Sequence, residues 1–226
     1  MNILEEIRRS LEPQGLALRG GFHPGLSDDL PVRGNGRSWQ SIVLIGNLGG
    51  NLWSAFSQSA EREDGRPHAL DRWTQRILGE LADRIGARAL FPFGSPPWLP
   101  FQRWALKADD VTVSPLGILI HPVYGLWHAY RGALAFEEWL DLPPRPRSAN
   151  PCETCVGRPC LAACPVDAFE PGHYDVKGCR THVSGPDGGA CRDGGCLARL
   201  ACPVGRARAY GSEQMAFHMA AFLAGR

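Results

Sequence analysis

Two stretches of the chain carry apolar side chains at the spacing of an amphipathic helix, residues 2–12 and residues 68–85. In the second stretch the apolar stripe consists of Leu70, Trp73, Ile77, Leu81 and Ile85. Gly86 follows directly, where a helix often ends on a residue in the left-handed conformation. The pattern therefore predicts a helix at each stretch, and further helices are predicted at residues 52–59, 100–108 and 212–223.

Continuous apolar runs indicate strands between these helices. Residues 41–46 are predicted to form a strand that is buried on both faces, and further strands are predicted at 16–23 and 88–93. Residues 111–136 are interpreted as two strands joined by a turn at residues 122–125. Since strands and helices alternate in no regular β-α-β order, the expected fold class is α+β.

The glycine-rich segment 47–51 lies between a predicted strand and a predicted helix. It matches no phosphate-binding fingerprint. A plain tight turn is therefore the first interpretation, and contact with a phosphate or a flavin is the second.

A proline-rich segment separates the chain into two parts. The expected layout is an α+β domain at 1–142, a linker at 143–151, a cysteine-rich domain at 152–211 and a C-terminal helix at 212–226.

The charge of the chain is nearly balanced, with 24 basic and 23 acidic residues among 226. This balance gives no electrostatic reason to expect binding to nucleic acid or to an anionic membrane. The longest apolar runs, 42–46 and 116–120, are too short to span a bilayer. Clustered cysteines behind an N-terminus that does not resemble a signal peptide predict the reducing cytoplasm.

All eight cysteines lie between Cys152 and Cys202. They form two runs, and each run ends in a Cys-Pro-Val sequence. Disulfides suit this pattern poorly because nothing marks the chain as secreted. Zinc is an alternative, since closely spaced cysteines also bind zinc. Four thiolates that converge on a 4Fe–4S cluster suit the pattern best.

The cysteine runs resemble two-cluster ferredoxin domains, such as the one in epoxyqueuosine reductases. In those domains the cysteine before proline ligates the other cluster. The resemblance implies one 4Fe–4S cluster on Cys152, Cys155, Cys160 and Cys202, and a second on Cys164, Cys179, Cys191 and Cys196. The spacing departs from the family pattern, and the glycine-rich insertion at 184–189 is expected to supply positive φ angles and N–H groups to cluster sulfur.

A second resemblance lies in the segment 120–132. An Ile-His-Pro-x-aromatic-Gly-x-Trp run followed by Arg-Gly resembles the cobalamin-processing chaperone family of methylmalonic aciduria type C, on Ile120, His121, Pro122, Tyr124, Gly125, Trp127, Arg131 and Gly132. The resemblance implies a flavin-reductase-like, nitroreductase-related N-terminal domain that binds a corrinoid, with a flavin as the second choice. The implied cofactor-binding residues are His121, Tyr124, Gly125, Trp127 and Arg131.

Structural interpretations of the same residues stay open. His121 before a proline is also typical of a turn histidine, Trp127 of a core residue, and Arg131 of an ion-pair partner. Trp53 and Trp104 are further candidates for an apolar floor under a corrin ring, although Trp104 also suits the core.

Together these patterns predict an iron–sulfur protein that takes electrons from an external donor and reduces a bound corrinoid. Whether it is an enzyme is open; as one it would be an iron–sulfur-dependent corrinoid reductase, and no residue is assigned as its catalytic acid. The alternatives are a ferredoxin-type electron carrier whose N-terminal domain only docks partners, and a structural zinc protein. The sequence does not indicate an oligomeric state.

Overall fold

The computed structural model describes residues 2–31, 36–170 and 172–225. The chain forms two compact units. The sheet unit comprises Met1–Asp110 and Ala129–Arg147, and the cysteine unit comprises Val111–His128 and Ser148–Arg226. Both units mix helices with strands, so the predicted α+β class is confirmed. Residues Val111–His128 group with the cysteines, whereas the sequence analysis assigned them to the N-terminal domain.

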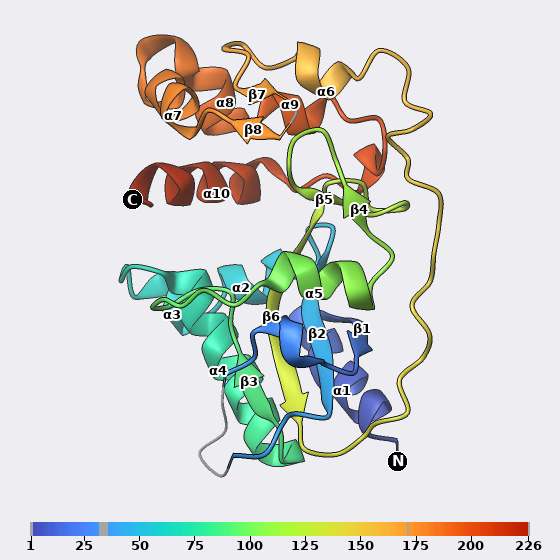
Figure 1. Ribbon diagram of the computed structural model, residues 1–226. Coiled ribbons are helices and arrows are strands. Elements are labelled where there is room, and N and C mark those ends of the chain that lie inside the picture. Colours follow the sequence, from blue (N-terminus) through green and yellow to red (C-terminus); the bar gives the residue numbers. More distant parts are fainter. Residues whose placement is uncertain (1, 32–35, 171, 226) are drawn as a thin grey trace. The chain divides into compact units, whose positions relative to one another are not determined.

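The sheet unit contains a four-stranded sheet in the order β1-β2-β6-β3 (Figure 1). Its strands are β1 (Ala17–Phe22), β2 (Ser41–Leu48), β3 (Arg88–Leu90) and β6 (His128–Phe136), the first residue of which belongs to the cysteine unit. Its helices are α1 (Ile3–Leu11), α2 (Trp53–Ser57), α3 (Ala60–Glu63), α4 (Ala69–Ile85) and α5 (Phe101–Ala108), with 3-10 turns η1 (Glu12–Gln14) and η2 (Leu26–Asp28).

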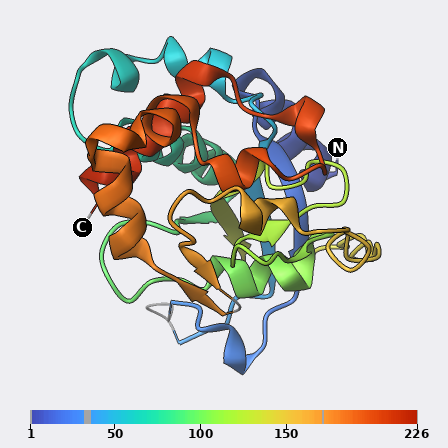
Figure 2. The ribbon, with the colours of Figure 1, turned by 90° about the horizontal axis from the view of Figure 1, so that it is seen from above.

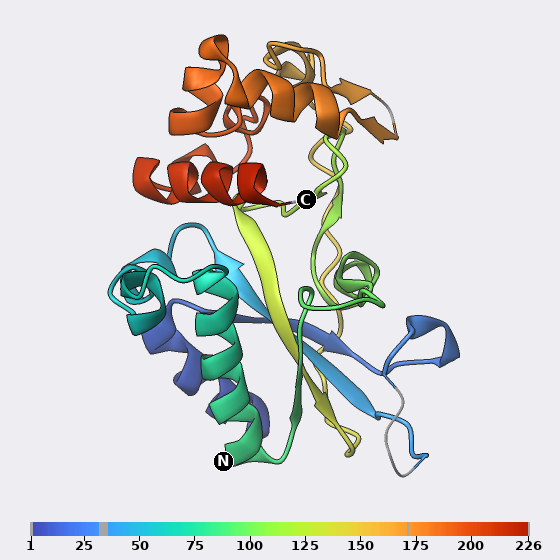
Figure 3. The ribbon, with the colours of Figure 1, turned by 90° about the vertical axis from the view of Figure 1, so that its left-hand side faces the viewer.

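Strand β2 forms the centre of this unit, and its residues Ile42 to Ile45 are fully buried. It pairs antiparallel with β1, and β3 pairs antiparallel with β6. Helices α1 and α4 cover one face of the sheet and α5 covers the other (Figure 3). The continuous apolar run in the sequence follows from this arrangement, since a strand covered on both faces has no polar side.

The helices predicted at residues 2–12 and 68–85 are present as α1 and α4. In α1 the Asn2 side chain accepts a hydrogen bond from the Leu4 N–H at 3.0 Å, and α4 ends at Gly86 with φ +71°. The predicted apolar face of α4 is shifted in part. Leu78 is buried in place of Ile77, and Ile85 is only half-buried.

The predicted pair of strands in residues 111–136 is wrong in part. A short hairpin of β4 (Thr112–Val113) and β5 (Leu119–Ile120) comes first, around a turn in which Gly117 has φ +74°. Strand β6 then joins β2 and β3 rather than β5. The turn at residues 122–125 is present, because the backbones of His121 and Gly125 exchange hydrogen bonds of 2.9 and 2.8 Å.

The cysteine unit is built from short elements (Figure 1). Besides β4 and β5 these are α6 (Pro159–Ala162), β7 (Phe169–Glu170), β8 (His173–Tyr174), α7 (Val176–Ser184), η3 (Pro186–Gly188), α8 (Gly189–Gly194), α9 (Leu197–Leu200), η4 (Arg206–Arg208) and α10 (Ser212–Ala224). The predicted C-terminal helix is α10, which packs along α8 and α7 (Figure 2). Across the described ranges, the helices are all too short or too polar to span a membrane.

Candidate functional site

Four thiols of the cysteine unit influence one another electrostatically and are called set one: Cys152, Cys155, Cys160 and Cys202. Burial raises the pKa of the Cys152 thiol, and the nearby thiols of Cys202, Cys160 and Cys155 raise it further. Burial likewise raises the pKa of Cys160, with Cys202 as the next cause. Cys202 lies far along the chain from the other three members, so the fold brings the last cysteine of the second run to the first run.

The remaining thiols form set two: Cys164, Cys179, Cys191 and Cys196. All four line one cavity of 310 Å³ in the cysteine unit. Burial raises the pKa of Cys179, and the thiols of Cys164 and Cys191 add to the effect. The pKa of Cys196 is raised first by burial and then by Cys179 and Cys191. Here the last cysteine of the first run lies among three cysteines of the second run.

Backbone N–H groups point toward several of these sulfur atoms. The Ala168 N–H donates to Cys164 Sγ at 3.3 Å. Backbone hydrogen bonding from Arg199 and Ala198 lowers the pKa of the Cys196 thiol, and that from Val204 lowers the pKa of the Cys202 thiol. Such N–H···S hydrogen bonds stabilise negative charge on sulfur, as the ligands of an iron–sulfur cluster require.

The glycine-rich insertion at 184–189 does not have the backbone that the sequence analysis expected. It forms the end of α7, the turn η3 and the start of α8, and Gly185, Gly188 and Gly189 all have negative φ. The reason for Gly188 is close packing, because a Cβ atom there would lie 2.1 Å from the His182 carbonyl oxygen. The predicted positive φ angles are therefore wrong.

Across residues 2–31, 36–170 and 172–225, no three side chains of the His, Cys, Asp or Glu type converge as ligands of one metal ion. A mononuclear zinc site needs four ligand atoms around a single point. A 4Fe–4S cluster has a different requirement, since each of its four thiolates binds a different iron atom.

The segment from Ile120 to Trp127 belongs to the same unit as both thiol sets. Ile120 and Leu126 are buried in one apolar cluster with Cys160 and Cys202. Gly125 has φ +56°, and a Cβ atom there would lie 1.9 Å from the Val204 carbonyl oxygen. The glycine of this motif is therefore needed for packing against the backbone that follows Cys202.

His121 shapes the turn in this segment. Its Nδ1 atom accepts hydrogen bonds from the N–H groups of Val123 at 3.0 Å and Tyr124 at 3.3 Å. Its ring also meets that of Tyr124 edge to face, with 5.1 Å between centroids. In the neutral imidazole these bonds place the proton on Nε2. His121 therefore acts as a turn histidine through Nδ1. A hydrogen bond from this ring to a ligand would have to come from Nε2.

Three other sequence candidates, Arg131, Trp104 and Trp53, all belong to the sheet unit. Arg131 lies in the sheet unit, where its Nη2 atom is 2.6 Å from an Asp71 carboxylate oxygen, so the ion-pair interpretation is realised. Trp104 is also in the sheet unit; it is fully buried and donates from Nε1 to the Asp28 carbonyl oxygen at 2.8 Å. Trp53, half-buried, packs against Phe56 at 5.6 Å.

Three side chains of the cysteine unit have buried polar atoms with no hydrogen-bond partner among the described residues. They are the Thr112 hydroxyl group, the Nε1–H group of Trp127, 2% exposed, and both ends of the Gln214 amide, 1% exposed. Leaving a buried polar group unpaired costs about 1–3 kcal/mol. Sequence reasoning missed Gln214, because a single glutamine in an amphipathic helix carries no local signal of burial.

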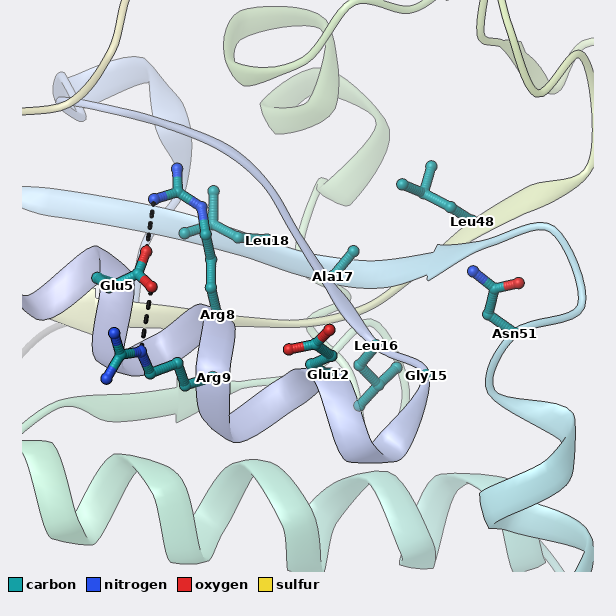
Figure 4. A pocket seen from close by; sticks show the side chains of 10 residues that line it. All are labelled: Glu5, Arg8, Arg9, Glu12, Gly15, Leu16, Ala17, Leu18, Leu48 and Asn51. Atoms are coloured by element: carbon teal, nitrogen blue, oxygen red, sulfur yellow. Dashed lines mark hydrogen bonds and ion pairs between the residues drawn. The ribbon is translucent and has the colours of Figure 1, made fainter.

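A groove of 500 Å³ in the sheet unit carries charged side chains but no cysteine (Figure 4). Figure 4 shows Glu5 between Arg8 and Arg9, with ion-pair distances of 3.8 and 3.2 Å. Asn51, from the predicted glycine-rich turn, lies at its edge. Within that turn the Asn47 side chain donates to the Gly49 carbonyl oxygen at 2.8 Å, as in a plain tight turn. Paired charges of opposite sign give this groove no preference for an anion.

No protein-family model matches the sequence, and no curated protein matches it. Solved structures match the fold at low identity. The B12-trafficking protein CblC of C. elegans, a human MMACHC homologue, is 15% identical with a TM-score of 0.56 over 96% of this chain and 91% of its own.

Epoxyqueuosine reductase in complex with a modified stem loop of tRNA-Tyr is 14% identical, with a TM-score of 0.55 over 93% of this chain and 68% of its own. The Bacillus subtilis epoxyqueuosine reductase is 15% identical, with a TM-score of 0.51 over 92% of this chain and 68% of its own. The chain therefore shares its fold with both kinds of protein that the two sequence motifs resemble.

Proposed function

We propose that this chain is a cytoplasmic iron–sulfur protein that passes electrons from an external donor to a bound corrinoid. The observation that carries the proposal is the mixing of the two cysteine runs: Cys202 packs in one apolar cluster with Cys160 and Cys152, and Cys164 lines one cavity with Cys179, Cys191 and Cys196. When bound, two 4Fe–4S clusters would supply one-electron transfer, and a corrinoid would supply the cobalt that accepts the electrons.

The residues present suit two clusters. Set one would hold one cluster and set two the other, because buried thiols that raise one another's pKa need a nearby cationic group to become thiolates. The N–H groups of Ala168, Ala198 and Arg199 would orient the sulfur atoms of set two. The apolar side chains of Ile120 and Leu126 would exclude water beside set one.

The residues present also suit an amide-rich ligand. The rim of a corrin ring carries amide side chains, which both donate and accept hydrogen bonds. Trp127 Nε1–H would donate to such a group, and the Gln214 amide would do both. His121 would present Nε2, since its Nδ1 holds the turn. Arg131 stays a proposed contact of the ligand, and its ion pair with Asp71 would hold the side chain in place.

A second function, an electron carrier without a corrinoid, is favoured by the same ion pair and by the turn hydrogen bonds of His121. Both residues have structural roles that require no ligand. The binding experiment below separates the two functions.

The first experiment is metal analysis of protein purified without oxygen. We expect brown protein with about eight iron and eight acid-labile sulfide per chain, the content of two 4Fe–4S clusters. Cys202→Ser should remove the cluster of set one, although Cys202 lies in the second run, and Cys164→Ser should remove that of set two. Colourless protein that carries zinc would contradict the proposal, and so would loss of the same cluster in both variants.

The second experiment is a cobalamin titration followed by absorption spectroscopy. Gln214→Leu should weaken binding at least about tenfold, which is about 1.4 kcal/mol. The same variant should leave the ligand-free protein as stable as before or more stable, because it removes an unpaired buried amide. Gln75→Leu, on the exposed side of α4, is the matched control. Absence of any cobalamin-dependent spectral change would favour the plain electron carrier.

A further inference from the structure

Arg199 lies in α9, between the cysteines Cys196 and Cys202, and its guanidinium group is held rigidly. The Nε and Nη2 atoms donate to the Leu126 carbonyl oxygen at 3.1 and 2.6 Å. The guanidinium carbon lies 4.4 Å from the ring centroid of Trp127 and 4.6 Å from that of Tyr210. Two hydrogen bonds and two aromatic faces therefore fix this positive charge.

The same side chain lines the 310 Å³ cavity that the four thiols of set two also line. Most of the other lining side chains are apolar, among them Leu116, Phe169, Val183 and Phe222. A charge beside an apolar cavity is weakly screened, so it acts on the contents of the cavity more strongly than an exposed charge would. An arginine also keeps its charge at every pH at which proteins are stable.

Tyr174 supplies a second polar group at this cavity. Hydrogen bonding with Tyr174 lowers the pKa of the Cys179 thiol and so stabilises negative charge on its sulfur. The Tyr174 ring stacks on Phe169 with 4.7 Å between centroids and 12° between planes, which fixes the direction of the hydroxyl group. Set two therefore has a fixed cation and a fixed O–H donor.

Set one has a different surrounding. The positive charge of Arg158 lowers the pKa of the Cys152 thiol, and that of Arg206 lowers the pKa of the Cys202 thiol. Both arginines are exposed to solvent, so water and salt screen their charges. The two thiol sets thus differ in how strongly the protein stabilises added negative charge.

We propose that Arg199 and Tyr174 raise the reduction potential of the cluster at set two above that of the cluster at set one. Reduction adds one electron to a cluster, and a nearby cation or a hydrogen bond to sulfur stabilises the added negative charge. With both clusters bound, one electron given by the external donor to the cluster at set one would reduce the cluster at set two, which would pass it to the proposed corrinoid. The proposal rests on the proposed function, because it requires both clusters.

The test is a potentiometric titration of the anaerobically purified protein, followed by electron paramagnetic resonance. Signals are assigned with Cys202→Ser and Cys164→Ser, each of which keeps one cluster. Arg199→Gln should lower the midpoint potential of set two by at least about 59 mV, which is a tenfold change in a one-electron equilibrium, and leave set one unchanged. Tyr174→Phe should lower the same potential by a smaller amount.

Arg206→Gln is the matched control, and it should move neither potential by a comparable amount because its charge is exposed. Arg199→Lys keeps the positive charge, so it should lower the midpoint potential of set two by less than Arg199→Gln does. If Arg199→Gln does not fold, Arg199→Lys and Tyr174→Phe carry the test alone.

If both clusters are present but neither Arg199→Gln nor Tyr174→Phe changes the midpoint potential of set two, this inference is overturned. The proposed function would then remain intact. A wild-type potential at set two below that of set one would overturn the order of transfer. Protein without iron would instead overturn the proposed function itself.

Discussion

The sheet unit and the cysteine unit bury their interiors in different ways. In the sheet unit, β2 places four consecutive aliphatic side chains in the core, and large side chains such as Trp73 and Trp104 complete it. In the cysteine unit, three of the buried side chains are the cysteines Cys160, Cys191 and Cys202. Helices α6 and α9 have only four residues each. Such short helices are not stable alone, so the cysteine unit needs a further source of stability.

The difference indicates two sources of stability. Burial of aliphatic surface contributes about 25 cal/mol per Å² and requires nothing beyond the chain itself. Thiols that surround metal contribute only when the metal is bound, and then the binding free energy becomes folding free energy. We therefore expect the sheet unit to be stable by itself and the cysteine unit to depend on its clusters.

Removal of iron should have the largest effect. After treatment with a chelator and an oxidant, the segment 148–225 should become sensitive to protease, while residues 2–110 remain protected. Limited proteolysis with mass spectrometry measures this, and the untreated protein is the control. Protection of both segments after complete iron loss would mean that the cysteine unit folds without metal.

A substitution that leaves a cavity in the core of the sheet unit should destabilise that unit and leave the cysteine unit unaffected. Leu44 is fully buried in β2, so Leu44→Ala should destabilise the sheet unit by about 2–5 kcal/mol. Leu26 is fully exposed in η2, and Leu26→Ala should change stability by less than about 0.5 kcal/mol. Urea unfolding measures both free energies. Iron content should stay unchanged in both variants; parallel loss of iron in Leu44→Ala would show that the two units do not fold separately.

A smaller effect is expected for the ion pair between α3 and α4. Glu61 accepts hydrogen bonds from Arg76 Nε at 2.6 Å and Nη2 at 3.1 Å. The hydrogen bond from Arg76 is the first cause that lowers the pKa of Glu61 below 4.5. Because the pKa of Glu61 is lowered in the folded protein, the ion pair stabilises the protein at every pH above the ordinary value of 4.5. This contribution is lost as the pH falls through the lowered pKa of the folded protein.

Glu61→Gln should therefore cost about 0.2–1 kcal/mol at neutral pH, a modest value because Arg76 is partly exposed, and nothing at acidic pH. Urea unfolding at both pH values measures the difference, and Glu63→Gln, an exposed neighbour, is the control. An equal cost at both pH values would assign the effect of Glu61 to packing rather than to charge.

Local patterns in the sequence were sufficient to predict many elements. The helical spacing in α1 and α4 and the apolar run in β2 report which face of each element is buried, and this follows from the geometry of a single helix or strand. The predicted pair of strands in residues 111–136 was wrong at its first strand, which was expected to be long but is represented only by the short strands β4 and β5. The turn at Gly117 shortens that strand, and β6 finds its partners in β2 and β3.

The candidate site was predictable only in its chemistry. The thiols and the segment 120–127 are visible as motifs, but Arg199, Tyr174 and Gln214 are not. Arg199 lies between two cysteines in the sequence, which was a usable signal. Its importance depends on Leu126, Trp127 and Tyr210, and no local pattern links these residues.

By itself the sequence determined the α+β class, the long helices, the central strand and the two cysteine runs, because each depends on neighbours along the chain. Tertiary structure alone decided that Val111–His128 groups with the cysteines and that Asp71 pairs with Arg131. These features depend on contacts between segments far apart in sequence, where packing selects one partner among many that local patterns allow.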